Sequence, residues 1–305
     1  MSADLLRDLV GRLGASTNAL SAIGAALNAK AASAAPSLEV RAHLDEVLTA
    51  LGVREAIDGL SPAAARPLLG EIRVALLHGI ERVTRGALDA GWKHTEPGML
   101  QAAGDVSAGF PALLQRIIPR LHGLASRLDV EDARFLDVGV GVAALSIEMA
   151  RLWPNLRVVG LDVWAPALAL ARGNVKSAGL EARVELREQS VQDLTDTQAF
   201  DLAWIPSAFI PGPVIPEAVH RVHRSLRPGG WVLFATVNPS ADPLALSLAR
   251  LRTVEWGARP WTPTEATRVL EESGFEDVVT LPSPPAALVA LVAGRVPDRR
   301  SPRRP

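Results

Sequence analysis

The segment from Phe135 to Ala143 constrains the fold of this 305-residue chain more than any other. An apolar run leads into the acidic residue Asp137, Gly139 and Gly141 follow, and a helical pattern begins at Ala144. This order predicts a strand, a tight turn and a helix. Glycines adopt backbone angles closed to other residues and let a ligand approach the backbone closely. We therefore expect a nucleotide-like ligand at this turn.

Short apolar runs alternate with helical patterns after this turn, which favours a parallel sheet built from βαβ units. A longer segment at 238–263 interrupts the alternation after the fifth strand and reads as an insertion. The last two strands have no helix between them and can pair as an antiparallel hairpin. We expect strands at 133–138, 157–162, 183–188, 200–205, 231–237, 277–281 and 287–293, and helices near 142–152, 165–178, 214–227 and 263–273.

The first part of the chain has a different pattern. Residues 1–105 contain no convincing strand, and their leucines recur at helical spacing, with Pro36 and Pro62 marking helix starts. We expect a Gly- and Pro-rich connector at 91–107, and a helix at 108–128 with a kink at Pro119. The domain prediction is a helical domain over 1–105, an α/β domain over 106–295 and a disordered Arg- and Pro-rich tail over 296–305.

Composition excludes several classes of protein. The net charge of −1 gives no indication of a nucleic-acid partner, and the chain has no cysteine for a disulfide or a thiolate metal site. No cluster of acids and histidines has metal-ligand spacing, so metal-independent chemistry is expected. The start of the chain lacks a signal-sequence pattern, and no apolar run approaches the ~20 residues that span a bilayer. These features predict a soluble cytoplasmic protein without a membrane partner.

The glycine turn alone leaves two kinds of ligand open. Gly139, Gly141 and Ala144 fit the dinucleotide pattern G-x-G-x-x-G/A, and Asp162 stands where a ribose-binding acid is expected. The carboxylate of Asp137, however, would repel a pyrophosphate and suits a ligand with cationic groups. A single α/β unit after a helical domain, ending in an antiparallel hairpin, also disfavours a dinucleotide. These features favour S-adenosylmethionine over NAD.

Several motifs in order carry a family resemblance. They are Leu136–Gly141, Val159–Asp162, Arg183–Leu186 with Ser190–Leu194, Phe200–Trp204 and Leu226–Trp231. With these motifs, residues 133–293 resemble the class I S-adenosylmethionine-dependent methyltransferases. The resemblance implies a Rossmann-like seven-stranded sheet of order 3-2-1-4-5-7-6, with the last strand antiparallel and helices on both faces. It also implies that the helical N-terminal domain forms a homodimer and covers the active site.

The resemblance assigns a role to each matching position. It implies that Asp137 binds the methionine ammonium group, that Gly139 and Gly141 let the backbone approach the donor, and that Asp162 binds both ribose hydroxyls. Adenine would lie against Val163 and Trp164 and meet Ser190 and Val191 at its edge; Ile205 and Pro206 would line the methyl-transfer channel. Two positions depart from the family pattern: Ala143 replaces a frequent third glycine, and Ser190 replaces a frequent aspartate.

The acceptor side is less specified by the sequence. His94 is our candidate catalytic base because it lies in the connector just before the α/β domain; the alternative is a solvated or capping loop histidine. The loop at 209–213 and the segment at 238–263, with Trp256 and Trp261, are expected to shape an apolar acceptor pocket. The predicted function is methyl transfer from S-adenosylmethionine to a small-molecule or natural-product-like acceptor, on oxygen. Transfer to a nitrogen or a peptide carboxylate, and donor binding without methyl transfer, stay open.

Overall fold

The computed structural model describes residues 3–32, 36–84, 90–239, 242–283 and 287–298. These residues fall into two compact units, which we treat separately. One comprises the described residues within 1–85 and 98–109, and the other those within 86–97 and 110–305. Most of the predicted Arg- and Pro-rich tail lies outside the described residues.

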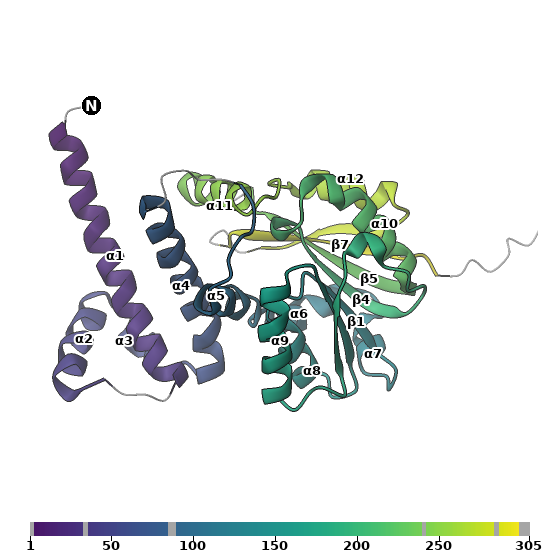
Figure 1. The fold of residues 1–305 in the computed structure, drawn as a ribbon, viewed down its shortest axis with the longest axis horizontal. Coiled ribbons are helices and arrows are strands. Elements are labelled where there is room, and N and C mark those ends of the chain that lie inside the picture. The colour runs from purple at the N-terminus through teal and green to yellow at the C-terminus, as the bar shows by residue number, and fades with distance from the viewer. Residues whose placement is uncertain (1–2, 33–35, 85–89, 240–241, 284–286, 299–305) are drawn as a thin grey trace, which may run out of the picture. The chain divides into compact units, whose positions relative to one another are not determined.

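The first unit is helical (Figure 1). Its helices are α1 (Ala3–Ala32), α2 (Leu38–Ala50), α3 (Arg54–Asp58), α4 (Pro62–Thr84) and α5 (Pro97–Ser107). The hydroxyl of Ser37 caps α2 by accepting the N–H of Val40 at 3.4 Å, and that of Ser61 accepts the N–H of Ala64 at 3.2 Å. Serine hydroxyls satisfy N–H groups that a helix start otherwise leaves free. Helices α1, α2, α3 and α4 pack around one apolar core, which contains Leu27, Leu48, Ile57, Ala65, Leu69 and Ile72.

Helix α5 corrects the sequence prediction of an irregular connector reaching residue 107. Gly98 and Gly104 suggested a loop, but Pro97 occupies the start of a helix, where its missing N–H costs nothing. Met99 and Leu100 are buried, so packing outweighs the low helix propensity of the glycines. A Cβ atom at Gly70 would lie within 3.0 Å of α5 atoms, so glycine there allows α4 and α5 to pack closely.

The second unit contains a seven-stranded sheet in the order β3-β2-β1-β4-β5-β7-β6. Strands β1 to β5 pair in parallel, and β7 pairs antiparallel with both β5 and β6. The predicted sheet order and hairpin are therefore confirmed. The strands are β1 (Arg134–Val138), β2 (Arg157–Asp162), β3 (Val184–Glu188), β4 (Phe200–Pro206), β5 (Leu226–Val237), β6 (Glu276–Leu281) and β7 (Val289–Arg295).

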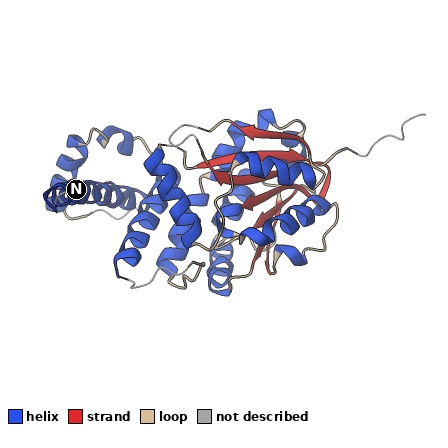
Figure 2. Ribbon diagram, turned by 90° about the horizontal axis from the view of Figure 1, so that it is seen from above, coloured by secondary structure: helices blue, strands red, loops and turns tan. Residues whose placement is uncertain are grey.

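Helices cover both faces of this sheet (Figure 2). They are α6 (Phe110–Ile117), α7 (Leu124–Leu128), α8 (Ala144–Leu152), α9 (Ala165–Ser177), α10 (Ile215–Ser225), α11 (Pro243–Glu255) and α12 (Pro263–Glu272), with short 3-10 turns at Ile118–Arg120, Val191–Asp193, Ser207–Phe209 and Gly212–Val214. One buried cluster packs helices α6, α7, α8 and α9 against one face of the sheet. A second packs α10 and α12 against the other face. Apolar burial on both faces is typical of a parallel sheet and explains its continuous apolar strands.

Three details of this unit differ from the sequence prediction. The expected helix at 108–128 is two helices, because Pro119 lies in a 3-10 turn and Gly123 adopts a φ of +78° before α7. Strand β5 begins at Leu226, which pairs with Phe200 before a bulge at 227–230, instead of at Trp231. The segment read as an insertion contains α11, whose first N–H groups are capped by the carboxylate of Asp242.

A buried carboxylate at the amino-terminal edge of the sheet connects several segments through hydrogen bonds and ion pairs. Asp201, at the start of β4, is 2% exposed. It accepts the backbone N–H of Arg134 at 3.0 Å, bonds Nη1 of Arg227 at 2.7 Å and pairs with Arg127 at 3.5 Å. This carboxylate is therefore paired with two arginines.

None of the described helices is long and apolar enough to cross a bilayer.

Candidate functional site

The turn after β1 brings the carboxyl ends of β1 and β2 together. Gly139 and Gly141 adopt φ values of +72° and +55°, which glycine tolerates without a Cβ clash. The N–H groups of Gly139 and Val140 both donate to the carbonyl of Leu161, at 2.8 and 2.9 Å. The Val140 side chain then lies over Gly160, where a Cβ atom would come within 2.8 Å of Val140 Cβ. The backbone at 139–141 is thus held close to β2.

Asp137 is buried at the start of this turn, and none of the described residues gives it a cationic partner. Its side chain is 2% exposed and accepts a hydrogen bond from the hydroxyl of Ser146 on α8 at 2.6 Å. Burial raises the pKa of Asp137 to about 7, the Ser146 hydroxyl opposes that rise, and the charge of Asp162 adds to it. No described lysine, arginine or histidine is among the groups that influence this carboxyl. A cation placed beside it would favour its ionised form.

Asp162 ends β2 and organises the neighbouring backbone. Its Oδ2 accepts the N–H of Gly141 at 2.7 Å, and its Oδ1 accepts the N–H of Trp164 at 2.8 Å. Burial raises the pKa of Asp162, although the N–H groups of Trp164, Gly141 and Val163 lower it. Two carboxyl groups with raised pKa values thus lie near one glycine turn, an arrangement suited to cations and hydroxyl donors.

The remaining predicted donor residues also follow the carboxyl ends of the strands. Val163 is exposed after β2, whereas Val191 is buried after β3. The Ser190 hydroxyl accepts the N–H of Gln192 at 3.2 Å and so caps a 3-10 turn. The N–H of Gln189 donates to the carbonyl of Asp162 at 2.9 Å, which ties the ends of β2 and β3 together.

The end of β4 approaches the glycine turn from the other side. Ile205 is fully buried, and Pro206 follows it at the strand end. A Cβ atom at Gly139 would lie 3.6 Å from Cγ of Pro206, so the two residues are neighbours. The structure therefore brings Asp137, Gly139 and Pro206 to one edge of the sheet.

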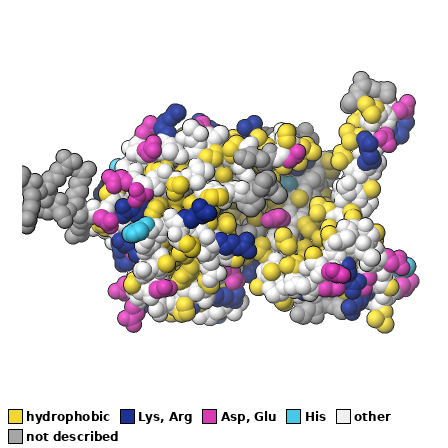
Figure 3. Space-filling view, turned by 180° about the vertical axis from the view of Figure 1, so that it is seen from behind, with side chains coloured by type: hydrophobic (Ala, Val, Ile, Leu, Met, Phe, Trp, Pro, Cys, Tyr) yellow, Lys and Arg dark blue, Asp and Glu magenta, His cyan; other side chains and the backbone are white. Residues whose placement is uncertain are grey.

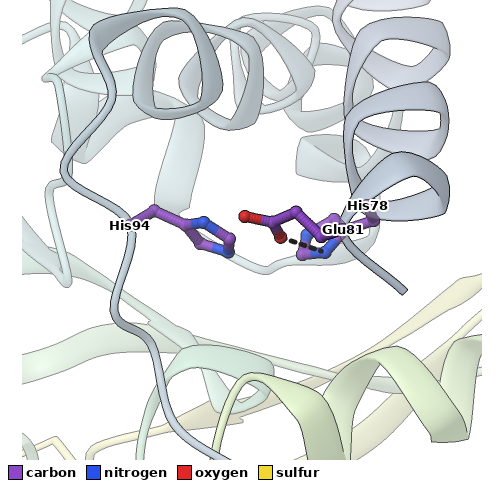
Figure 4. Close-up of side chains that lie close together, drawn as sticks. All are labelled: His78, Glu81 and His94. Atoms are coloured by element: carbon purple, nitrogen blue, oxygen red, sulfur yellow. Dashed lines mark ion pairs between the residues drawn. The ribbon is translucent and has the colours of Figure 1, made fainter. Parts of the chain in front are cut away.

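His94 belongs to an irregular segment, residues 90–96, of the same unit (Figure 4). Its carbonyl accepts a hydrogen bond from Nε1 of Trp164 at 2.6 Å, and its ring meets that of Trp92 edge-on at 4.7 Å. His94 is thus fixed beside a predicted donor residue. In the helical unit, His78 and Glu81 pair with each other one turn apart on α4, at 3.6 Å (Figure 4).

An aromatic cluster surrounds Trp92. The rings of Phe209 and Trp256 stack at 4.5 Å, and Trp92 meets them edge-on at 5.3 and 5.6 Å. The guanidinium of Arg252 lies over the Trp256 ring, 5.1 Å from its centroid. Phe209 follows β4 and Trp256 follows α11, so the cluster stands at the carboxyl edge of the sheet. Trp261 instead packs on Phe234 of β5, within the core of the second face.

Sequence reasoning missed two contributors to this edge. Ser146 is the only described side chain that hydrogen-bonds Asp137; a serine in the first turn of the helix after the glycines was the available signal. Arg252 lies on a helix that the sequence pattern did not reveal, so the sequence did not predict its contact with Trp256.

The chain is similar to methyltransferases in sequence and in fold. Residues 135–230 match the family model described as a methyltransferase domain. A ubiquinone biosynthesis O-methyltransferase of Xanthomonas oryzae pv. oryzae is 35% identical over 133 residues, which are 42% of this chain and 53% of that protein. One from Hydrogenovibrio crunogenus is 30% identical over 147 residues, 47% and 59% of the two chains. The chain spans about half the length of the curated relatives it matches.

Solved structures share the fold over nearly the whole chain. A putative O-methyltransferase from Nostoc punctiforme has a TM-score of 0.61 at 16% identity, with 97% of this chain and 99% of that chain covered. The S-adenosylmethionine-dependent methyltransferase SibL, in its apo form, has a TM-score of 0.57 at 21% identity and the same coverage. Human N-acetylserotonin methyltransferase in complex with SAM has a TM-score of 0.57 at 16% identity, with 97% and 100% covered.

Proposed function

We propose that this chain is an S-adenosylmethionine-dependent methyltransferase that transfers the donor's methyl group to an oxygen atom of a small molecule. Its match to a methyltransferase domain over residues 135–230 and its similarity to O-methyltransferases support this proposal. Asp137 carries the proposal, because a buried carboxyl with a pKa of about 7 and no described cationic partner fits a cationic ligand. S-adenosylmethionine has an ammonium group and supplies its methyl group from a sulfonium. Both cations are attracted by carboxylates near the glycine turn.

The donor is proposed to lie along the carboxyl edge of β1 and β2. Asp137 accepts a hydrogen bond from the ammonium group, and the positive φ angles of Gly139 and Gly141 leave room for close approach. Asp162 accepts hydrogen bonds from the two ribose hydroxyls. Its carboxylate already faces the N–H of Gly141, which supports a position over the turn.

The adenine end is proposed to lie beyond β2. Val163 and Trp164 pack on the ring, and the segment of Ser190 and Val191 meets its edge. The Ser190 hydroxyl caps a turn in the structure, so the Val191 backbone is the more available contact. Ile205 and Pro206 line the methyl-transfer channel on the opposite side; the contact between Pro206 and Gly139 supports that assignment.

His94 is proposed as the general base for a hydroxyl acceptor. Methyl transfer needs the nucleophile aligned with the methyl carbon at about 3 Å, and a base accelerates it where a hydroxyl must lose its proton. His94→Gln is expected to lower kcat about 100- to 10,000-fold with donor affinity changed less than about threefold. His122→Gln, at an exposed histidine, is the matched control. Equal kcat for His94→Gln and wild type would remove His94 from the catalytic residues.

The acceptor is proposed to be apolar and aromatic. Trp92, Phe209 and Trp256 form an aromatic wall at the carboxyl edge, and Phe209 is 40% exposed there. Aromatic side chains offer large apolar faces on which a planar ring can stack. A natural-product-like phenol fits this wall. Metal-independent chemistry and a cytoplasmic location stay predictions.

The decisive experiment is transfer of a labelled methyl group. The purified chain with labelled S-adenosylmethionine and a panel of phenols and catechols is expected to give labelled methyl ethers. Label on a peptide or a nitrogen instead would support the alternative acceptors. Tight donor binding without transfer to any phenol, amine or peptide in the panel would contradict the proposed enzyme.

We also propose that the helical unit forms a homodimer through the first half of α1. Leu6, Leu13, Leu20 and Leu27 recur every seven residues along this helix. Leu27 is 2% exposed in the core of the unit, whereas Leu6 and Leu13 are 51% and 54% exposed. Figure 3 shows apolar side chains beside charged ones at that end of α1. The heptad stripe of one α1 can therefore continue against the same stripe of a second copy.

Sedimentation at micromolar concentration tests the dimer. The wild type is expected to sediment as a dimer, and the double substitution Leu6→Glu and Leu13→Glu as a monomer, because charges replace the exposed part of the stripe. Val40→Glu, at an exposed residue of α2, is the control. A monomeric wild type would refute the proposed interface.

A further inference from the structure

Residues 90–96 form a segment, here called the strap, that is attached at two places. At one end the N–H of Gly91 donates to the carbonyl of Glu255, the last residue of α11, at 2.9 Å. At the other, the carbonyl of His94 accepts the Nε1–H of Trp164 at 2.6 Å. The attachment points belong to the same compact unit.

Strand order determines where the strap runs. Trp164 follows the carboxyl end of β2, while α11 follows the carboxyl end of β5. In the sheet, β1 and β4 lie between β2 and β5. Because Trp92 within this segment contacts Phe209, which follows β4, the strap runs along the carboxyl edge of the sheet, where the tip of β1 bears Asp137 and the glycine turn.

The middle of the strap is fixed by aromatic contacts. Trp92 meets Phe209, after β4, and Trp256, after α11, through edge-on ring contacts. Its ring also meets that of His94. Edge-on pairs of this kind are directional, so they restrict the orientation of both rings.

Gly257 allows the first attachment. It adopts a φ of +83°, and a Cβ atom there would lie 2.8 Å from the Cα of Gly91. No side chain can occupy that space unless the strap backbone moves away from α11. Glycine at 257 is therefore required both by its own conformation and by the closeness of the strap.

We infer that Trp164 and Gly257 are positioning residues of the methyl-transfer site, which hold the strap across the β1 tip so that Trp92 and His94 stand over the donor. This inference rests on the proposed function. Trp164 acts through its indole N–H, separately from any packing of its ring on the donor. Gly257 acts only through the space that it leaves for Gly91.

Two variants with matched controls test the inference. Trp164→Phe removes the N–H donor and keeps an aromatic ring; Trp231→Phe is its control, because Trp231 Nε1 donates to the His122 carbonyl at 3.1 Å, away from the strap. Gly257→Ala displaces the strap. Its control, Gly179→Ala, has a φ of +66° with open space around the Cβ position, so it carries the same backbone strain alone.

Hydrogen exchange and kinetics are the measurements. Both strap variants are expected to speed exchange of the Gly91 amide about 3- to 10-fold, as loss of one hydrogen bond allows. At saturating donor, kcat for the phenol found in the labelling screen is expected to fall about 10- to 100-fold. Affinity for S-adenosylhomocysteine is expected to stay within about threefold in Gly257→Ala, whose residue has no proposed contact with the donor, and the controls are expected to match the wild type.

The outcomes separate the strap from the proposed function. Unchanged exchange at Gly91 in both variants would overturn the attachment, whether or not the chain transfers methyl groups. Faster exchange with unchanged kcat would overturn the positioning role. An equal fall in kcat for Trp231→Phe or Gly179→Ala would do the same, since the loss would then reflect stability alone. A wild type without methyl transfer would refute the proposed function and, with it, the positioning role. The exchange result would still test whether the strap is attached as described.

Discussion

Two aspartates of the same sheet are buried equally and have opposite surroundings. Asp201 at the amino-terminal edge and Asp137 at the carboxyl edge are each 2% exposed. Asp201 bonds Arg227 and pairs with Arg127, whereas among the described residues Asp137 bonds only the Ser146 hydroxyl, and the charge of Asp162 raises its pKa further. Burying a charge is costly unless it is paired. The paired edge therefore stabilises the fold, and the unpaired edge is suited to bind a cation.

Removing the charge at the paired edge is expected to have the largest effect. Asp201→Asn leaves two half-buried arginines without their carboxylate and is expected to lower the free energy of unfolding by about 3 kcal/mol or more. Urea unfolding measures this loss, and calorimetry with S-adenosylhomocysteine is expected to show unchanged affinity in the folded variant. Asp298→Asn, at an exposed partner of Arg295, should leave unfolding unchanged. An Asp201→Asn variant as stable as the wild type would show that ion pairing at the amino-terminal edge does not stabilise the fold.

Asp162→Ala is expected to affect binding at the opposite edge. Hydrogen bonds to a charged group contribute about 1.5–3 kcal/mol each, so loss of two from ribose lowers donor affinity at least 100-fold. Calorimetry with S-adenosylmethionine measures this change. Asp193→Asn, at an exposed residue after β3, is the control. Undiminished affinity would refute the assignment of Asp162.

Asp137→Asn is expected to stabilise the free protein and weaken donor binding. The pKa of about 7 in the folded state exceeds the ordinary value of 3.8, so the folded protein favours the protonated form. This contribution to stability is complete below about pH 4 and is lost as pH rises through 7. At pH 8 the asparagine variant is expected to be more stable by about 1–3 kcal/mol and to bind donor 10- to 100-fold more weakly.

The same group predicts the pH dependence of wild-type affinity. A cationic donor binds the ionised form of Asp137, so affinity for S-adenosylmethionine is expected to rise from pH 5 to about 7 and then level off. Calorimetry across this range measures it, and the asparagine variant should lose most of the slope. Asp129→Asn, at an exposed carboxyl, should keep it. A destabilised Asp137→Asn variant at pH 8 would contradict the unpaired state of this carboxyl.

The sequence predicted the sheet well because its signals are local. Each strand is a short apolar run followed by a helical pattern, and both faces are buried, so periodicity and turns locate the elements. Asp137, Gly139 and Gly141 come from one contiguous turn, and strand order brings Asp162 beside them. Their proximity follows from the fold; their binding roles remain predictions.

The acceptor side was less predictable because it depends on distant segments. Trp92 precedes both Phe209 and Trp256 by more than a hundred residues in sequence, and only the packed chain shows that their rings meet. Helix α11 was read as an insertion because its exposed leucines obscure an apolar face. At Pro97, a residue typical of loops begins a helix instead. In each case tertiary packing decided between local preferences of similar strength.

The smallest expected effect concerns Ala143, which lies in the turn but outside the donor contacts. Its φ of +64° is costly for a residue with a Cβ atom, by about 1–2 kcal/mol. Ala143→Gly relieves this strain but gives the unfolded chain more freedom, which offsets about 0.5–1 kcal/mol. Urea unfolding is therefore expected to show a gain between zero and about 1 kcal/mol, with donor affinity unchanged. Gly139→Ala, at a similar φ of +72° but beside Pro206, should lower both stability and affinity. A loss of stability in Gly139→Ala that only mirrors the gain in Ala143→Gly, with donor affinity unchanged, would mean that backbone conformation alone, rather than space for a ligand, accounts for glycine at this edge.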